Sequence, residues 1–216
     1  MSRTIYYTAT TLDGFIADPN DSLDWLLRQP QGESGSQDEN GSQSEAEPQG
    51  ETQNQDTEQG REDPGDYERF IAGVGAMVMG STTYEWVLRH ESGVWPYRMP
   101  TWVMTHRELT MPTNANDEDR LGIRFAQGNV TEVHAEMRGA AAGKDIWVVG
   151  GGDLAGQFAE AGLLDEVISS IAPVTLGAGR PLLPRRLDLE LVETGRNGAF
   201  LTARHRVVGP LAEDRD

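Results

Sequence analysis

The stretch Ile146-Trp147-Val148-Val149-Gly150-Gly151-Gly152-Asp153-Leu154 decides the fold. Its apolar first half predicts a buried strand, and a helix from Asp153 to about Ala161 follows the three glycines. Strands that run through a short turn into a helix are the repeating units of α/β domains. Glycines let the backbone approach a pyrophosphate, and a helix N-terminus presents free N–H groups to it. The alternative is a purely structural turn in which Asp153 caps the helix, and this stretch alone does not choose between the two.

Two other predicted strands end in residues that suit a phosphate. The strand Ala76–Met79 is followed by Gly80, Ser81, Thr82 and Thr83 at the start of a helix over residues 82–89, and the strand Thr101–Met104 is followed by Thr105, His106 and Arg107. Each has a plain alternative, which is N-capping by Ser81 or Thr82 in the first case and an ordinary polar loop in the second. Because ligands of open α/β sheets bind at the carboxyl ends of strands, the agreement of three strand ends favours a phosphate-bearing ligand.

The rest of the chain completes this pattern. Further strands are predicted over residues 3–12, 123–126 and 166–172, and helices over 130–141 and from Asp66, where Tyr67, Phe70, Ile71 and Val74 recur at helical spacing. Residues 187–193 and 199–208 flank Gly195–Gly198, which is typical of a hairpin. We therefore expect a three-layer α/β fold with a mostly parallel central sheet, helices on both faces and a C-terminal antiparallel hairpin.

One segment has a different composition. Residues 29–66 hold eleven carboxylates and a single arginine, and residues 30–64 contain no Val, Ile, Leu, Met or aromatic side chain. Such a segment buries too little apolar surface to offset its ordering entropy. The sequence predicts one domain over residues 1–210, interrupted at 29–65 by an acidic, disordered insertion and followed by a polar tail, 211–216. Residues 113–121 are polar and predict a loop.

Composition excludes several classes of protein. The net charge is −17, which argues against nucleic-acid binding, and the absence of cysteine excludes disulfides and thiol chemistry. No apolar run reaches the roughly 18 residues of a membrane span. The first residues lack the apolar stretch of a signal peptide, so a cytoplasmic protein that does not bind membranes is expected.

The motifs together resemble the dihydrofolate reductase superfamily. The chain is most similar to stand-alone proteins that resemble the C-terminal reductase domain of the bifunctional deaminase-reductase of riboflavin biosynthesis. The similarity runs from Ile5 to about Val208 without residues 29–64, and the segments that carry it are 11–17, 78–85, 149–154, 164–167 and 172–179.

The resemblance implies a cofactor site and its residues. NADPH is the expected cofactor, with NADH as an open alternative. Ala9 and Ile16 would touch the nicotinamide; Gly80, Thr82 and Thr83 would receive the pyrophosphate and ribose; and Gly150, Gly151 and Gly152 would lie against the pyrophosphate, with Asp153 and Leu154 opening the helix. Thr105, His106 and Arg107 would lie near the adenosine ribose and its 2′-phosphate. The family often has an arginine at the position of Ser81. Arg107 could take the role of that missing arginine in this chain.

The substrate side is less defined. Asp66 stands where folate reductases carry an acidic residue and is the candidate proton donor, but a helix N-cap is the favoured interpretation. Asp24 and Trp25 are candidates for substrate contact, and the alternative for Trp25 is a core position. A homodimer is compatible with the resemblance.

These observations predict an NAD(P)H-dependent reductase of a small heterocyclic metabolite. The substrate types implied by the resemblance are pterins, folates and the ribosylamino-pyrimidine of riboflavin biosynthesis. The rival hypothesis is a non-catalytic nucleotide-binding or partner-binding protein that retains the fold.

Overall fold

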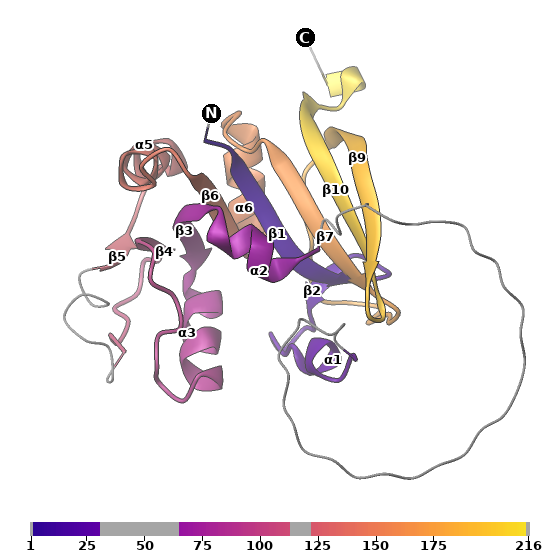
Figure 1. Ribbon diagram of the computed structural model, residues 1–216, viewed down its shortest axis with the longest axis horizontal. Coiled ribbons are helices and arrows are strands. Elements are labelled where there is room, and N and C mark those ends of the chain that lie inside the picture. The colour runs from indigo at the N-terminus through magenta and orange to yellow at the C-terminus, as the bar shows by residue number, and fades with distance from the viewer. Residues whose placement is uncertain (1, 31–64, 113–121, 215–216) are drawn as a thin grey trace, which may run out of the picture.

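The computed structural model describes residues 2–30, 65–112 and 122–214. Within them, eight strands form one twisted sheet in the order β5-β4-β3-β6-β1-β7-β10-β9 (Figure 1). The strands of this sheet are β1 (Thr4–Thr11), β3 (Val74–Gly80), β4 (Thr101–Met104), β5 (Ile123–Ala126), β6 (Asp145–Gly150), β7 (Glu166–Ala172), β9 (Leu187–Asn197) and β10 (Phe200–Pro210).

Six neighbouring strands run parallel, and the C-terminal hairpin completes the sheet with β10 in the opposite direction and β9 in the direction of the other six. The first strand, β1, lies between β6 and β7, so that Tyr6 is in register with Val148 on one side and Val167 on the other. The last strand, β10, is antiparallel to both β7 and β9. The predicted fold class is therefore confirmed.

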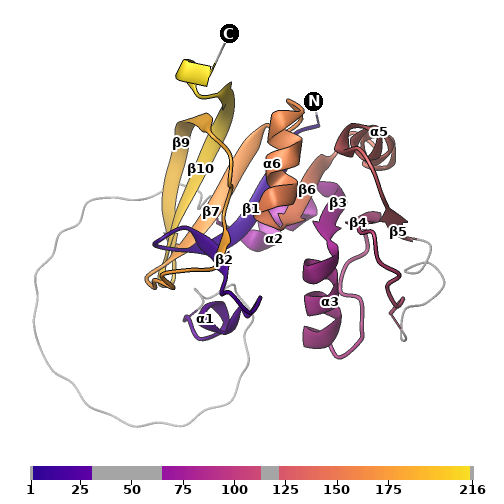
Figure 2. The same cartoon turned by 180° about the vertical axis from the view of Figure 1, so that it is seen from behind.

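Helices cover both faces of the sheet. They are α1 (Asp24–Leu27), α2 (Tyr67–Ala72), α3 (Ser81–His90), α5 (Val130–Ala140), α6 (Gly152–Glu160) and the short 3-10 helix η1 (Ala212–Asp214). Figures 1 and 2 show α2 on one face and α6 on the opposite face. None of the described helices has the length and apolar character needed to cross a membrane.

The two faces have separate cores because side chains alternate along each strand. Along β6, Ile146 and Val148 belong to the core that includes Phe158 of α6 and Met137 of α5. Their neighbour Trp147 belongs to the other core, which packs against α2 and α3. The apolar strand β6 is thus buried on both sides, as expected for a central parallel strand.

A second, two-stranded sheet was not predicted. It pairs β2 (Phe15–Ala17) with β8 (Arg180–Pro181) in antiparallel orientation. Gly179, with φ of +157°, precedes β8, and a Cβ there would lie 2.1 Å from the carbonyl oxygen of Ala17. Only glycine allows the two backbones to come this close.

Three local expectations are corrected. Val74 begins β3 rather than ending the helix, because α2 stops at Ala72 and Gly73 is its C-cap. The hairpin strands extend through Gly195 to Asn197 and resume at Phe200, so the turn is shorter than predicted. The helix after the glycine triplet begins at Gly152 instead of Asp153. Most of the predicted insertion and the loop at 113–121 lie outside the described residues.

Candidate cofactor cleft

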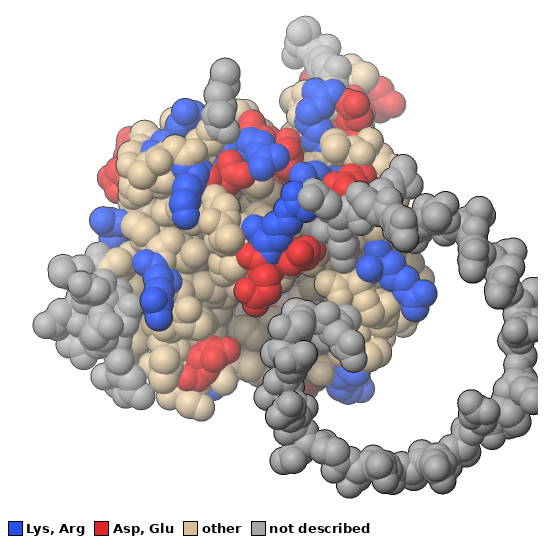
Figure 3. Space-filling model, in the orientation of Figure 1, with Lys and Arg blue, Asp and Glu red and all other residues tan. Residues whose placement is uncertain are grey.

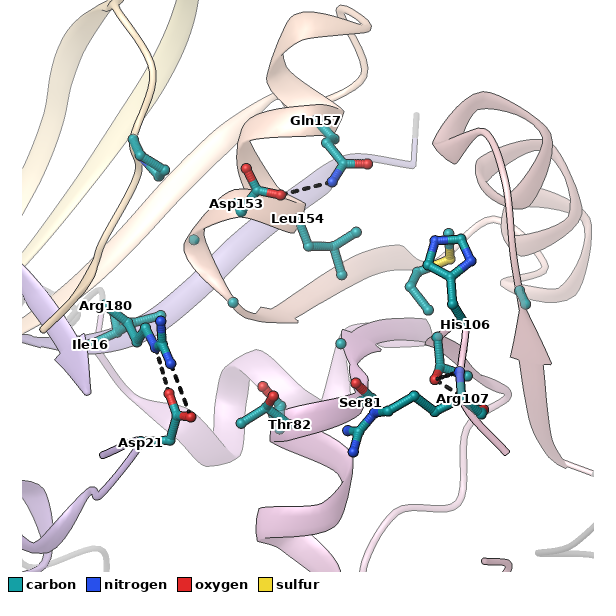
Figure 4. A pocket seen from close by; sticks show the side chains of 18 of the residues that line it. Ile16, Asp21, Ser81, Thr82, His106, Arg107, Asp153, Leu154, Gln157 and Arg180 are labelled. Atoms are coloured by element: carbon teal, nitrogen blue, oxygen red, sulfur yellow. Dashed lines mark hydrogen bonds and ion pairs between the residues drawn. The ribbon is translucent and has the colours of Figure 1, made fainter. Parts of the chain in front are cut away.

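A cleft of about 670 Å³ lies at the carboxyl ends of the parallel strands (Figure 4). The ends of β3, β4, β5 and β6 contribute its wall, and the β2–β8 sheet contributes the other side. The residues that line it are Ile16, Asp21, Gly80, Ser81, Thr82, Thr83, Met104, Thr105, His106, Arg107, Ala126, Gln127, Gly128, Gly151, Gly152, Asp153, Leu154, Gln157, Arg180, Pro181 and Pro184. Its volume is in the range of cofactor and small-molecule sites, about 300–1,000 Å³.

Two helices begin at this cleft. Gly80 is the N-cap of α3 and Gly151 is the N-cap of α6, and neither helix has a side-chain cap hydrogen bond. The alternative in which Ser81, Thr82 or Asp153 caps its helix is therefore wrong, because all three lie inside the first turns. The first N–H groups of a helix have no partner within it and carry its positive dipole end. Two such ends at one cleft make a place for an anion.

The glycines of the triplet have different surroundings. A Cβ on Gly152 would lie 2.2 Å from the carbonyl oxygen of Pro181, so the backbone of β8 requires glycine there. A Cβ on Gly151 would meet only the Ile16 side chain, at 3.8 Å, and would project into the cleft. A Cβ on Gly150 would approach the Thr83 hydroxyl at 3.3 Å. Gly151 therefore keeps a surface clear that the fold itself does not fill.

A hydroxyl-based turn holds the third strand end in place. The backbone N–H of Arg107 donates to Thr105 Oγ1 at 2.9 Å, and the same hydroxyl donates to the Arg107 carbonyl at 3.1 Å. Thr105 is buried, while the Arg107 side chain is 55% exposed and pairs with Glu85 of α3 at 2.9 Å. The turn thus places one guanidinium beside the N-terminus of α3 (Figure 4).

An ion pair that sequence reasoning missed marks the other end of the cleft. The guanidinium of Arg180 contacts Asp21 through two nitrogen–oxygen distances, 2.6 and 3.2 Å. The hydrogen bond from Arg180 lowers the pKa of the Asp21 carboxyl below its usual value. Arg180 lies in β8 and Asp21 follows β2, so the pair ties together two segments far apart in the sequence.

Asp153 lines the cleft, and its charge is compensated. Its carboxylate accepts a hydrogen bond from Gln157 at 2.9 Å and pairs with Arg185 at 3.0 Å. The hydrogen bond from Gln157 lowers the pKa of Asp153 most, and the bond from Arg185 lowers it further. The repulsion that a bare carboxylate would exert on a phosphate is reduced accordingly.

Most of the predicted cofactor residues meet in this cleft. Twelve of the fourteen line it, and the exceptions are Gly150, which lies next to the Thr83 hydroxyl, and Ala9, which packs against the core cluster that contains Trp25. Gln127 and Gly128 were missed, although they follow β5, which ends at Ala126, in the same way that Thr105–Arg107 follows β4. The strand-end rule applied to β5 would have found them.

The substrate candidates lie elsewhere. Asp66 is exposed and caps α2 by accepting the Arg69 N–H at 3.1 Å. It borders a second, smaller hollow of about 190 Å³ together with Arg3, Asp145 and Arg204, where Figure 3 shows acidic and basic side chains side by side. Trp25 is 2% exposed and belongs to a core cluster with Ala172 and Phe200, and its helix neighbour Asp24 does not line the cleft.

The residues of the cleft fit a dinucleotide. The two helix N-termini and the clear face of Gly151 suit a pyrophosphate, and Arg107 beside them suits a further anionic group. Ile16 supplies apolar surface at the opposite end, next to the Arg180–Asp21 pair. This donor set is therefore compatible with the cofactor that the sequence resemblance implies.

Comparison with known proteins defines the class. The model of the RibD C-terminal domain matches residues 3–199, so the chain belongs to the RibD C-terminal domain family. Two proteins of Bacillus subtilis (strain 168) are similar over most of their lengths. The uncharacterized protein YwjB is 29% identical over 181 residues, which cover 83% of this chain and 82% of YwjB. The uncharacterized protein YyaP is 26% identical over 199 residues, 89% of this chain and 87% of YyaP.

Solved structures share the fold. A putative riboflavin biosynthesis protein from Shewanella sp. PV-4 matches with a TM-score of 0.66 and 22% identity, over 95% of this chain and 98% of that one. RibD of Acinetobacter baumannii matches with a TM-score of 0.59 and 15% identity, over 96% of this chain and 58% of that one. Dihydrofolate reductase from Enterococcus faecalis, complexed with NADP(H), matches with a TM-score of 0.50 and 11% identity, over 95% of this chain and 96% of that one.

Proposed function

We propose that this protein is an NADPH-dependent reductase of a small heterocyclic metabolite of the pterin, folate or riboflavin-precursor type. Membership of the RibD C-terminal domain family and the NADP(H) complex of a protein with the same fold support this proposal. The observation that carries it is the convergence of two helix N-termini without side-chain caps on one cleft that Gly151 keeps clear.

The geometry of the cleft supports the following roles for the cofactor and for the protein. The cofactor would supply the hydride, and the protein would supply orientation and electrostatics. The N-termini of α3 and α6 would hold the pyrophosphate, and Arg107 would bind the 2′-phosphate through charge-assisted hydrogen bonds. At the other end, Ile16 would exclude water beside the nicotinamide, while the Arg180–Asp21 pair fixes the β2–β8 wall that carries Ile16.

A second candidate has one observation in its favour. Asp66, the candidate proton donor, caps α2 and borders a different hollow from the cofactor residues. A chain that binds the dinucleotide without reducing a substrate would be a nucleotide-binding protein that retains the fold. Oxidation of NADPH in the presence of dihydropterins, dihydrofolate or the ribosylamino-pyrimidine separates the two candidates.

The first experiment is a binding titration. NADPH and NADH are added to the purified protein and binding is followed by calorimetry, with the expectation that at least NADPH binds below millimolar concentration. Failure of both to bind at millimolar concentration would contradict the proposed function.

A further inference from the structure

The two arginines of the cleft are held differently. Arg180 meets Asp21 through two nitrogen atoms, whereas Arg107 meets Glu85 through one, at 2.9 Å, and the two arginines lie on opposite sides of the cleft (Figure 4). A guanidinium carries five N–H donors, so Arg107 keeps donors for a second anion. The Arg107 end of the cleft is therefore the end at which an additional phosphate is best received.

Glu85 stands behind that guanidinium. It lies on α3, one turn after Ser81, and does not line the cleft itself. The Thr105 turn fixes the backbone of Arg107 but does not touch its guanidinium. Among the described contacts, the Glu85 carboxylate is the one that holds the guanidinium and offsets its charge.

We propose that Glu85 sets the selectivity of the cleft between a dinucleotide with an additional phosphate monoester at its adenosine end and one without it. This inference rests on the proposed function. A phosphate that reaches Arg107 must share the guanidinium with Glu85 and is repelled by its negative charge. A free ribose hydroxyl at the same place has no charge to be repelled. Glu85 therefore weakens the binding of NADPH and leaves that of NADH nearly unchanged.

The substitution Glu85→Gln isolates the charge. The amide oxygen of glutamine still accepts a hydrogen bond from Arg107, so the guanidinium keeps its orientation while the negative charge is removed. We expect NADPH to bind about three- to tenfold more tightly and the affinity for NADH to change by less than about twofold, as suits a partly exposed charge near a phosphate. The gain should shrink at high salt, because salt screens exposed charges.

Three comparisons make the test specific. Glu91→Gln removes one charge at the other end of the same helix and should leave both affinities unchanged. In an Arg107→Ala background, Glu85→Gln should favour NADPH less than it does beside Arg107, because only the direct repulsion between the carboxylate and the phosphate is then removed. Two compounds that carry only the adenosine end should show the same selectivity. Glu85→Gln should tighten the binding of adenosine 2′,5′-bisphosphate, which has the 2′-phosphate, and leave that of 5′-AMP, which lacks it, nearly unchanged.

The possible failures are distinguishable. If the wild-type protein binds neither NADPH nor NADH, the proposed function falls and this inference falls with it. If both bind but Glu85→Gln changes them equally, or weakens NADPH, or acts as strongly without Arg107 as with it, the selectivity assigned to Glu85 is wrong while the proposed function stands.

Discussion

At the scale of single residues, neighbouring glycines of the triplet have different roles. Gly152 is needed by the fold, because the β8 backbone leaves no room for a Cβ. Gly151 faces the cleft and has only the flexible end of Ile16 nearby. The sequence Gly150-Gly151-Gly152 predicts a close backbone approach, but it does not show which glycine meets the protein and which faces the cleft. That distinction depends on β8, which is about 30 residues away in the chain.

We predict that Gly151→Val abolishes or greatly weakens cofactor binding without unfolding the domain. The valine side chain would project into the cleft, where the pyrophosphate approaches the N-terminus of α6. Calorimetric titration with NADPH measures the first effect, and thermal unfolding measures the second.

The matched variant is Gly152→Ala, whose added methyl group would meet the carbonyl oxygens of Pro181 and Leu182. It should lower the free energy of unfolding by about 1–3 kcal/mol, because the two backbones must move apart. Normal NADPH affinity in Gly151→Val, or unfolding of that variant, would show that Gly151 is only part of a structural turn.

At the scale of elements, apolar patterning predicted the strands of the main sheet and the longer helices. Strands such as β6 are short apolar runs with β-branched and aromatic residues, and α5 and α6 carry apolar residues at helical spacing. The boundaries of elements were predicted less accurately where the apolar spacing of a helix continued into the following strand. Val74 continues the helical spacing of Phe70 and Ile71. It nevertheless belongs to β3, because Gly73 is the C-cap of α2 and Val74 pairs with β6.

The cleft was largely predictable because the parallel strands of the sheet were predicted. Parallel strands end at one edge of the sheet, so the residues after β3, β4 and β6 were expected to meet there, and they do. What patterning did not reveal is the β2–β8 sheet and its Arg180–Asp21 pair. The two strands have three and two residues, too few for a period, and their pairing depends on long-range contacts.

The helix α2 offers a test of Asp66 that separates capping from proton donation. Asp66→Asn retains a good N-cap and removes the acid, whereas Asp66→Ala removes both. We predict that Asp66→Ala lowers the free energy of unfolding by about 0.5–2 kcal/mol and that Asp66→Asn changes it by only a few tenths. Denaturant unfolding at neutral pH measures both.

Turnover completes this test. As the cap of a helix outside the cofactor cleft, Asp66 is expected to tolerate Asn with little loss of activity toward whichever substrate supports NADPH oxidation. A large loss of turnover in Asp66→Asn at unchanged stability would instead establish Asp66 as the proton donor.

At the scale of the whole molecule, the two described ends of the acidic segment reach the same place. The carbonyl of Pro30 accepts a hydrogen bond from Ala199 N at 3.4 Å, and the carbonyl of Gly65 accepts one from Asn197 Nδ2, also at 3.4 Å. Gly65 is fixed further by Tyr7, whose hydroxyl donates to the same carbonyl at 2.8 Å. Both ends are thus tied to the turn between β9 and β10, and a short connection is sufficient to join them.

We therefore predict that a short Gly/Ser linker can replace residues 31–63 and leave a domain that unfolds cooperatively. The replaced residues have no apolar side chain larger than that of Ala46, so their contribution to the core is small.

The replacement also removes ten carboxylates and one arginine. Because a strongly negative chain repels an anionic cofactor, NADPH affinity should be unchanged or should rise at low salt, and any rise should fade as salt screens the charges. Thermal unfolding and calorimetric titration at two salt concentrations measure both effects. Loss of cooperative unfolding, or a weaker affinity for NADPH, would show that the segment supports the fold or the cleft directly.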